Sequence, residues 1–329
     1  MKILVLGGAG YIGSHMVRFL RERAVDVVVF DNLSTGHAFL AGDAPLVDVD
    51  VCDAAALRRA FDAHGPFTAV IHFCARSLVG ESVREPELYR RVNVGGAQNL
   101  LDVMHATGHR RLVFSSTAAI YGVPQTPYID EAHPAQPVNP YGETKLAVEQ
   151  LLRGQAATRG LDSVSLRYFN AAGAHPDGSI GELHEPETHL IPNVMLAAFG
   201  GPPLSLFGDD WPTPDGTCVR DYVHVNDLAD AHWRALQYME THPGAHAFNL
   251  GNGQGYSVRE VIAAAGRVLG RTVPYAVQPR RAGDPPVLVA DASRARRELG
   301  WQPAWTRLDD IIASAVPFFT RQVLPRRLQ

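Results

Sequence analysis

The chain has 329 residues, of which 46% are hydrophobic, and this length and composition predict a packed core and about two domains. Its formal net charge of −4 gives no basic surface, so nucleic acid is not expected as a partner. The three cysteines, Cys52, Cys74 and Cys218, form neither a metal-ligand spacing nor an even-numbered disulfide set, which favours a reducing compartment.

The N-terminal run MKILVLGGAGYIG has one lysine before an apolar stretch, as a secretory leader does. The stretch is short, however, and breaks into glycines without a signal-peptidase pattern. No apolar segment of about 18 residues, the length needed to span a membrane, follows anywhere in the sequence. We therefore expect a soluble, cytoplasmic protein that does not associate with membranes.

Four apolar runs in the first half of the chain are typical of strands buried on both faces of a parallel sheet. They cover residues 2–7, 27–30, 69–73 and 111–116. Between the first two, residues 11–24 carry apolar side chains at helical spacing, with Arg and Glu on the opposite side. Strand, helix and strand in series predict an α/β fold with a Rossmann-type, doubly wound parallel sheet.

The sequence changes in character near residue 170, after which segments rich in Gly, Pro and His show no clear period. We therefore expect a Rossmann domain at residues 1–170 and a smaller C-terminal α/β substrate domain at residues 171–329. Residues 220–236 and 286–300 are regular enough to pack back on the first sheet, so we expect the two domains to be interleaved.

Three glycines, Gly7, Gly10 and Gly13, follow the first predicted strand and open the first predicted helix. Glycine lets the backbone approach a pyrophosphate closely, and N–H groups at a helix N-terminus attract anions. A glycine-rich turn alone is a weak signal, but Asp31 ends the next strand, where a carboxylate accepts hydrogen bonds from ribose hydroxyls and repels a 2′-phosphate. The pattern predicts a dinucleotide site that selects NAD over NADP.

Residues at the ends of later strands are further candidates for this site. We expect Asp50 to approach the adenine edge. We expect residues 72–77 and Asn93 to lie where loops meet the carboxyl edge of the sheet, the place where ligands bind in such folds. For Phe73 and Cys74 taken alone, core packing is the simpler explanation.

The stretch NPYGETK sets Tyr141 four residues ahead of Lys145. On a helix this spacing puts both side chains on one face, where the ammonium lowers the pKa of the phenol. Most such pairs are incidental, but Ser115, Ser116 and Thr117 follow the fourth predicted strand and bring hydroxyls to the same edge. Tyr141 is therefore a candidate base with Lys145 and Thr117 as partners, although Thr117 alone would be interpreted as a helix cap.

Long motifs run over essentially the whole chain: GGAGYIGSH, DNLSTG, VIHF, VGES, FSSTAAIYG, NPYGETK, LRYFNAAGAHP, PETHLIP, FGDDWPTPDGTCVRDYVHVNDLADAH, FNLGNGQGYSV and PRRAGDP. With them the sequence resembles the UDP-glucose 4-epimerases, also called UDP-galactose 4-epimerases, of the extended short-chain dehydrogenase/reductase group. The first few motifs are shared by the wider group, and the later ones are specific to these epimerases. The resemblance implies an isomerase of nucleotide-sugar and galactose metabolism with NAD as its cofactor.

The resemblance also implies a mechanism. Tyr141, supported by Lys145 and with Thr117 as hydroxyl partner, would take the proton from the sugar 4-hydroxyl while hydride passes from C4 to NAD. The 4-keto intermediate would turn over in the pocket and be reduced on its opposite face. The net reaction interconverts UDP-galactose and UDP-glucose and consumes no cofactor.

By the same resemblance, two sets of residues are expected to contact the ligands. The NAD contacts are Gly7, Gly10, Tyr11, Ile12, Gly13, Asp31, Asn32, Leu33, Ser34, Thr35, Gly36, Asp50, Val51, Phe73, Cys74, Ala75, Ser77, Asn93, Thr117, Tyr141, Lys145 and Phe169. The UDP-sugar contacts are Thr117, Tyr141, Asn170, Thr188, His189, Leu190, Ser205, Leu206, Phe207, Arg220, Tyr222, Arg281, Asp284 and Leu288. Arg220 and Arg281 suit a diphosphate because a guanidinium matches phosphate oxygens.

Three positions depart from the family pattern. Ser77 stands where some members carry a lysine, so a cation is missing there, and Thr117 replaces a serine but keeps the hydroxyl. Leu288 occupies a position that is a bulky tyrosine in members restricted to non-acetylated sugars. Its smaller side chain leaves room for an N-acetyl group, which suggests activity on UDP-N-acetylglucosamine and UDP-N-acetylgalactosamine.

Two other functions compete with this one. A nucleotide-sugar 4,6-dehydratase shares the oxidation step but commonly has an Asp-Glu pair after the active-site Thr, where this chain has Ala118 and Ala119, which cannot transfer protons. A non-catalytic NAD sensor on the same fold typically loses the Tyr or the Lys, and this chain keeps both.

Partners other than the UDP-sugar follow only from the family. The resemblance implies a homodimer joined through helices that include the one bearing Tyr141. No metal is expected, because the histidines show no H-x-x-x-H or equivalent spacing, and His184, His189 and His224 are interpreted as structural or pocket-lining.

Overall fold

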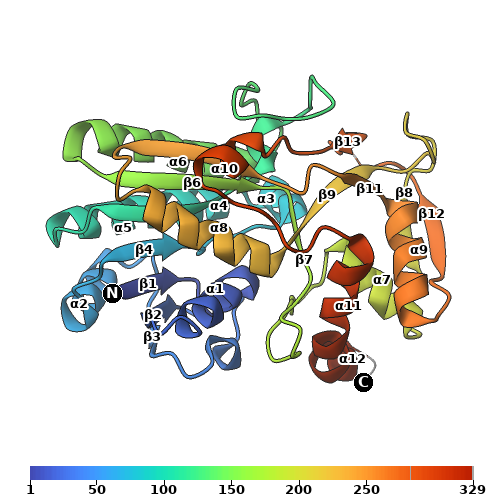
Figure 1. Ribbon diagram of the computed structural model, residues 1–329, viewed down its shortest axis with the longest axis horizontal. Coiled ribbons are helices and arrows are strands. Elements are labelled where there is room, and N and C mark those ends of the chain that lie inside the picture. Colours follow the sequence, from blue (N-terminus) through green and yellow to red (C-terminus); the bar gives the residue numbers. More distant parts are fainter. Residues whose placement is uncertain (282, 328–329) are drawn as a thin grey trace.

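The computed structural model describes residues 1–281 and 283–327 and is built around one sheet of seven strands (Figure 1). The strands lie in the order β10-β6-β5-β4-β1-β2-β3, and every neighbouring pair is parallel. Their bounds are β1 Lys2–Leu6, β2 Asp26–Asp31, β3 Leu46–Asp48, β4 Ala69–His72, β5 Arg111–Thr117, β6 Asp162–Tyr168 and β10 Ala245–Leu250. The predicted doubly wound parallel sheet is confirmed, and the four predicted strands lie at its centre.

Helices cover both faces of this sheet (Figure 1). The α-helices are α1 Tyr11–Arg21, α2 Ala54–His64, α3 Val79–Arg84, α4 Pro86–Tyr89, α5 Gly96–Ala106, α6 Pro140–Arg159, α7 Leu190–Ala198, α8 Val225–Tyr238, α9 Val258–Leu269, α10 Ser293–Glu298, α11 Leu308–Phe318 and α12 Leu324–Arg327. Short 3₁₀ or π segments are η1 Ala38–Ala41, η2 Arg90–Gly95, η3 Ala118–Tyr121 and η4 Phe319–Val323. Within the described residues, no helix is both long and apolar enough to cross a membrane.

Side chains alternate between the two faces of the sheet, and each face packs on its own helices. On β1, Ile3 and Val5 belong to a core that α1 and α8 complete. Leu4 and Leu6 belong to the opposite core, with side chains of α2, α5 and α6. All four side chains are at most 1% exposed, which explains why the strand is continuously apolar rather than alternating.

A smaller part of the molecule lies beyond the carboxyl edge of the sheet (Figure 1). Its strands are β7 Asn170–Ala172, β8 Leu204–Phe207, β9 Val219–His224, β11 Gly255–Ser257, β12 Tyr275–Gln278 and β13 Val287–Leu288. β9 pairs with β7 and β13 in parallel and with β11 antiparallel, while β8 pairs with β12. A third core between α7, α9 and α11 stabilises this part.

The chain crosses between the two parts more than once. The segment predicted at 220–236 forms β9, in the smaller part, and then α8, which packs on α1 of the main sheet. Residues 245–250 add the edge strand β10, and α10 packs against it. The domain boundary near residue 170 stays a prediction, because the ranges 1–170 and 171–329 both contribute to the main sheet.

Candidate active site

The candidate catalytic residues meet where β5 ends and α6 begins. Asn139 starts α6 by accepting a hydrogen bond from the Gly142 N–H through its side chain at 2.9 Å, and Pro140 occupies the first helical position. This start sets Tyr141 in the first turn and Lys145 one turn later. The observed helix agrees with the predicted placement of both side chains on one face.

Lys145 is buried against β5. Its Nζ donates to the backbone oxygen of Ser115 at 2.8 Å and lies 4.8 Å from the ring centroid of Phe114. Burial disfavours the ammonium and lowers the pKa of Lys145 to about 7, a shift that Cys74 partly opposes. Near neutral pH this lysine therefore exchanges its proton readily.

Tyr141 differs from the prediction in its pKa. Lys145 Nζ lies 6.0 Å from the centroid of the Tyr141 ring. Burial raises the pKa of Tyr141 to about 12, and only the neighbouring Thr117 hydroxyl acts to lower it. The expectation of a lysine-lowered pKa is thus wrong for the chain alone, because removing the phenol from water outweighs a cation whose own charge is weakened by burial.

The three hydroxyls at the end of β5 have different surroundings. Ser115 Oγ is hydrogen-bonded to the hydroxyl of Tyr168, and Ser116 Oγ donates to Glu149 at 2.7 Å. Thr117 Oγ1 accepts from the Ala119 N–H at 3.1 Å, so it caps η3 as well as neighbouring Tyr141. Of the three, Thr117 is the one whose hydroxyl adjoins the phenol.

A buried polar network behind the site was not found from the sequence. Arg167 donates to both oxygens of Glu149, at 2.9 and 2.6 Å, and to the hydroxyl of Tyr121 at 2.9 Å. Glu149 follows Lys145 by one turn of α6, and its side chain is 1% exposed. Because Ser116 shares the same carboxylate, the network fixes α6 against β5 and β6.

The turn between β1 and α1 has the properties of a dinucleotide site. A Cβ on Gly13 would lie 2.1 Å from the Gly7 oxygen, and Gly7 itself has φ +77° with the Cys74 backbone close by. On Gly10, by contrast, a Cβ would come no closer than 3.4 Å to its nearest neighbour, the Gly7 oxygen, so this face of the turn is open. Among the described residues no side chain caps the α1 N-terminus, which leaves its first N–H groups available for a phosphate.

Asp31 lies at the end of β2 as predicted. Its carboxylate accepts from the Ala9 N–H at 3.0 Å and from the Leu33 N–H at 2.9 Å. Burial raises its pKa, while these two hydrogen bonds act in the opposite direction. The carboxylate therefore holds the glycine turn and the 32–36 loop together, and Leu33 itself adopts a left-handed φ of +56°.

Most other expected NAD residues lie at the carboxyl edge of the sheet, after β3, β4 and β6. They are Asp50, Val51, Phe73, Cys74, Ala75, Ser77 and Phe169. Asn93 lies nearby, in the π-helical turn η2. There its side chain accepts from the Arg76 N–H at 2.8 Å and donates to Thr144 of α6 at 3.0 Å.

The expected UDP-sugar residues are spread over the smaller part. Arg220 donates to the Pro285 oxygen at 2.9 Å and lies 3.6 Å from Asp284, while Arg281 lies over the ring of Phe207 at 4.2 Å. Asn170 donates to the backbone oxygen of Asp221 at 3.0 Å. Ser205 and Leu206 lie beside Phe207 on β8, Tyr222 on β9, and Thr188, His189 and Leu190 at the start of α7.

Leu288 lies on β13, close to the segment that follows β5. It packs against the cluster of Ala118, Ile120 and Tyr121, which also contacts Phe169. This cluster follows Thr117 directly in the chain. The structure thus brings the residue expected to control sugar size next to the segment that bears the catalytic hydroxyl.

Asp221 is a positioning residue that was not predicted. Its buried carboxylate accepts backbone hydrogen bonds from Asn252, Gly253 and Ala290 at 2.8 to 3.2 Å. Burial raises its pKa to about 6 although these bonds act to lower it. It joins β9, which carries Arg220 and Tyr222, to the two loops that flank it.

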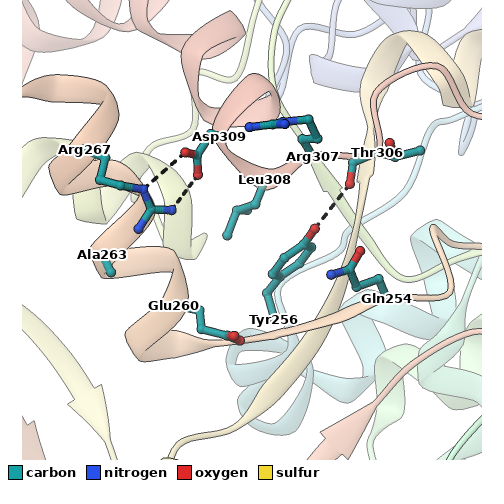
Figure 2. A pocket seen from close by; sticks show the side chains of 9 residues that line it. All are labelled: Gln254, Tyr256, Glu260, Ala263, Arg267, Thr306, Arg307, Leu308 and Asp309. Carbon is teal, nitrogen blue, oxygen red and sulfur yellow. Dashed lines mark hydrogen bonds and ion pairs between the residues drawn. The ribbon is translucent and has the colours of Figure 1, made fainter.

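A surface groove of about 460 Å³ lies elsewhere, between α9 and the start of α11 (Figure 2). Arg267 and Asp309 face each other across it at 2.8 Å, and Tyr256 donates to the Thr306 oxygen at 3.3 Å. None of its nine lining residues belongs to the expected ligand contacts. The candidate catalytic residues Thr117, Tyr141 and Lys145 lie away from this groove, at the β5–α6 junction.

Comparisons with known proteins cover the whole chain. A model of the NAD dependent epimerase/dehydratase family matches residues 3–251. The chain is 50% identical to the UDP-glucose 4-epimerase of Corynebacterium glutamicum over 321 residues, which covers 97% of this chain and 95% of that one.

Solved structures are similar over the same extent. The crystal structure of the UDP-glucose 4-epimerase from Brucella ovis in complex with NAD has a TM-score of 0.93 and 48% identity, and covers 97% of this chain and 98% of that one. That of the Bifidobacterium longum enzyme in complex with NAD⁺ and UDP has a TM-score of 0.93 and 38% identity, with 98% and 99% covered.

Proposed function

Because the chain belongs to the NAD dependent epimerase/dehydratase family, we propose that it is a UDP-glucose 4-epimerase that interconverts UDP-galactose and UDP-glucose. The family membership and the fold predicted from the motifs are confirmed. One observation supports this reaction most directly: Thr117, Tyr141 and Lys145 lie together at the end of β5. The glycine turn after β1 has an open face that would take the cofactor.

NAD, when bound, accepts hydride from C4 of the sugar and returns it to the opposite face. The chain holds NAD through the glycine turn, with Tyr11, Ile12 and the N–H groups of the α1 N-terminus at the phosphates. The adenosine ribose contacts Asp31 and residues 32–36. The nicotinamide half contacts residues 73–77, Asn93 and Phe169.

Tyr141 accepts the proton of the sugar 4-hydroxyl. The Thr117 hydroxyl either donates a hydrogen bond to the phenol oxygen or relays the proton to it. The charge of Lys145 favours the phenolate, and a phenolate in turn raises the pKa of Lys145, so the two groups titrate as a pair. With pKa values of about 12 and 7 in the chain alone, the phenol keeps its proton at neutral pH, so Tyr141 acts as a base only when added positive charge stabilises its phenolate. General-base help of this kind is worth about 10²- to 10⁴-fold in rate.

The smaller part anchors the nucleotide and leaves the sugar free to turn over. Arg220 and Arg281 are the diphosphate ligands, because their guanidinium groups match phosphate oxygens. The other expected UDP-sugar contacts are Ser205 to Phe207 of β8 and Thr188 to Leu190 at the start of α7. The dehydratase alternative lacks support, since Ala118 and Ala119 offer no acid or base next to Thr117.

The test is to incubate the purified protein with UDP-galactose and to follow UDP-glucose by chromatography without added reductant. Epimerase activity gives UDP-glucose until an equilibrium mixture is reached. Formation of a 4-keto-6-deoxy sugar would establish the dehydratase, and tight NAD binding without turnover would establish the sensor. Absence of UDP-glucose in the presence of bound NAD would overturn the proposal.

Leu288 supports a broader substrate range that includes UDP-N-acetylglucosamine and UDP-N-acetylgalactosamine. Its side chain is smaller than the tyrosine of restricted members and lies beside the Ala118 cluster. Leu288→Tyr is expected to abolish turnover of the N-acetylated sugars and to preserve that of UDP-galactose. No turnover of UDP-N-acetylglucosamine by the wild-type enzyme at saturation would reject this range.

The expected homodimer and cytoplasmic location belong to the same proposal. The homodimer would form through helices that include α6, so dimerisation would support the helix that bears Tyr141 and Lys145. Sedimentation equilibrium of the purified protein tests the dimer, for which the expected mass is twice that of the chain.

A further inference from the structure

Four potential metal ligands converge in the segment between β7 and α7. They are Glu182, His184, Glu187 and His189, and one ligand atom of each lies within 4.8 Å of those of the other three. Among the described residues this is the one such group of His, Cys, Asp or Glu. The spacing His-x-x-x-x-His, with a Glu two residues before the first His, is not a ligand pattern that sequence reasoning would single out.

Both carboxylates of the group are buried. The side chains of Glu182 and Glu187 are 8% and 6% exposed. Glu182 is hydrogen-bonded to His189 and lies 3.2 Å from His184 Nδ1, which has no partner of hydrogen-bond geometry in the described chain. Two buried carboxylates repel each other, so the site requires positive charge.

Glu187 is arranged to present one free oxygen. Its Oε1 accepts from the N–H groups of Thr188 and His189, both at 2.8 Å, which fixes the orientation of the carboxylate. Its Oε2 is buried and has no hydrogen-bond partner among the described residues. A buried carboxylate oxygen without a donor is costly unless a cation contacts it.

We propose that Glu182, His184, Glu187 and His189 bind a divalent first-row transition metal ion, with Zn²⁺ as the reference ion. Imidazole nitrogen suits zinc, iron, nickel and copper, and carboxylates complete such sites. One ligand atom of each residue lies within 4.8 Å of the other three, so rotations of the side chains would place all four around one ion. A divalent ion with two neutral imidazoles and two carboxylates is also neutral overall, which suits a site whose carboxylates are buried while the His189 side chain is 47% exposed.

The alternative occupant of the site is a pair of protons. The carboxylates raise the pKa of His184 to about 10 and also raise that of His189, although burial opposes both shifts. Other groups that face the cluster are Tyr11 and His15 of α1, whose pKa values respond to Glu182, and Arg327 of α12, which donates to the His184 backbone oxygen. Because an imidazole binds a metal only in its deprotonated form, the metal competes with protons for this site.

The ion would fix the 182–189 segment, which contacts Tyr11 at the glycine turn and leads into α7. The ring of His184 packs on that of Tyr11 at 6.2 Å, and Tyr11 begins α1 at the glycine turn. His189, which is also one of the expected UDP-sugar contacts, precedes Leu190, where α7 starts, so the ion would hold this contact in place. The role is structural: the ion closes the 182–189 loop against α1 and takes no part in proton transfer.

The experiment uses the full chain without an affinity tag, after treatment with a chelator and dialysis. Zn²⁺ is titrated by calorimetry in two buffers of different ionisation enthalpy, and Co²⁺ is titrated by visible absorption. One equivalent of ion with proton release is expected. His184→Ala and Glu182→Gln are each expected to weaken Zn²⁺ binding at least about 10-fold, the loss seen even for outer partners of metal sites.

His175→Ala is the matched control. His175 lies on the same connection and faces two carboxylates, Asp177 at 2.8 Å and Glu22 at 3.7 Å, but it is outside the group of four. This variant should bind Zn²⁺ as the wild type does. If circular dichroism shows that the ligand variants are unfolded, X-ray absorption of the Zn²⁺-loaded wild type identifies the ligands instead. The expected neighbours of the ion are two imidazole nitrogens and oxygen atoms.

Three results would overturn the site. They are no Zn²⁺ binding at concentrations up to about millimolar, the range of weak sites, unchanged binding in both folded ligand variants, and sulfur neighbours in the X-ray absorption spectrum. The last would assign the ion to a cysteine instead.

Discussion

At the head of α6, Tyr141 and Lys145 are both removed from water, and each resists the charged form that its role requires. Burial raises the pKa of Tyr141 to about 12 and lowers that of Lys145 to about 7. The YxxxK spacing predicted which residues meet, but it could not predict these shifts, because they depend on how deeply strands from distant parts of the chain enclose the pair. The pKa values of Tyr141 and Lys145 are thus set by how completely the surrounding strands and helices bury them.

Tyr141→Phe removes the phenolic oxygen and little else. We expect kcat to fall by about 10²- to 10⁴-fold, the usual contribution of a general base. Affinity for UDP, measured by calorimetry, should be essentially unchanged. Tyr128→Phe, which alters an exposed phenol in a loop, is the control and should have wild-type kcat. Wild-type turnover by Tyr141→Phe would show that another group takes the proton.

Lys145 makes stability depend on pH with a definite sign. Between about pH 7 and 10.5 the unfolded chain keeps a proton at this lysine that the folded chain has released. The free energy of unfolding therefore rises with pH in this window, by at most about 1.4 kcal/mol per pH unit from this group. Lys145→Met lacks this contribution.

Urea unfolding of nucleotide-free protein at pH 7 and pH 9 measures the difference. Relative to Lys145→Met, the wild type should gain about 2 kcal/mol on going to the higher pH. Lys2→Met controls for the loss of a lysine elsewhere and should keep the wild-type slope. An equal slope in wild type and Lys145→Met would mean that the buried lysine keeps its ordinary pKa.

At the scale of elements, the glycine turn was predictable and the register of α6 was not. Gly7, Gly10 and Gly13 are neighbours in sequence, and their spacing alone reports a strand-to-helix turn. The position of α6 depends on Glu149 and Arg167, which are 18 residues apart and lie on different elements. From the sequence alone, Glu149 would be predicted to face solvent, because a glutamate in a helix usually does. Its burial follows only from the position of Arg167 on β6.

The glycine turn offers a paired test. Gly13→Ala would put a Cβ 2.1 Å from the Gly7 oxygen, so we expect a loss of about 1 to 3 kcal/mol in the free energy of unfolding. Gly10→Ala meets no atom closer than 3.4 Å and has φ −86°, so the fold should tolerate it. Its methyl group would instead occupy the open face of the turn and weaken NAD binding.

Thermal melting and NAD titration by fluorescence separate the two effects. The expected pattern is a lower Tm for Gly13→Ala and a wild-type Tm with reduced NAD affinity for Gly10→Ala. Unchanged NAD affinity in Gly10→Ala would argue against a pyrophosphate at this turn.

On the scale of the whole molecule, the sequence predicted the first half of the sheet better than its completion. The strands at 2–6, 26–31, 69–72 and 111–117 are apolar and follow each other in regular units. β10, with the sequence AHAFNL, interrupts its apolar pattern with His246 and with the buried Asn249, which accepts from the Tyr121 hydroxyl at 2.6 Å and donates to the Ile129 oxygen at 2.8 Å. Its pairing with β6 joins residues about 80 positions apart, which no local pattern reports.

This arrangement predicts that residues 1–170 do not fold alone. A fragment ending there lacks β10 and α8, and so exposes the edge of β6 and the face of α1 that α8 covers. We expect it to show helical circular dichroism without a cooperative thermal transition. A cooperative transition like that of the full chain would establish the first 170 residues as an independent domain.

The late position of β10 also has a consequence during synthesis on the ribosome. β6 is complete in sequence at residue 168, but its partner ends at residue 250. At the usual rate of about 5–20 residues per second, translation leaves that edge open for several seconds before the last strand can emerge from the exit tunnel. Nascent chains of this length expose an unpaired backbone to their neighbours on a polysome, so ribosome-associated chaperones should bind most strongly in that interval.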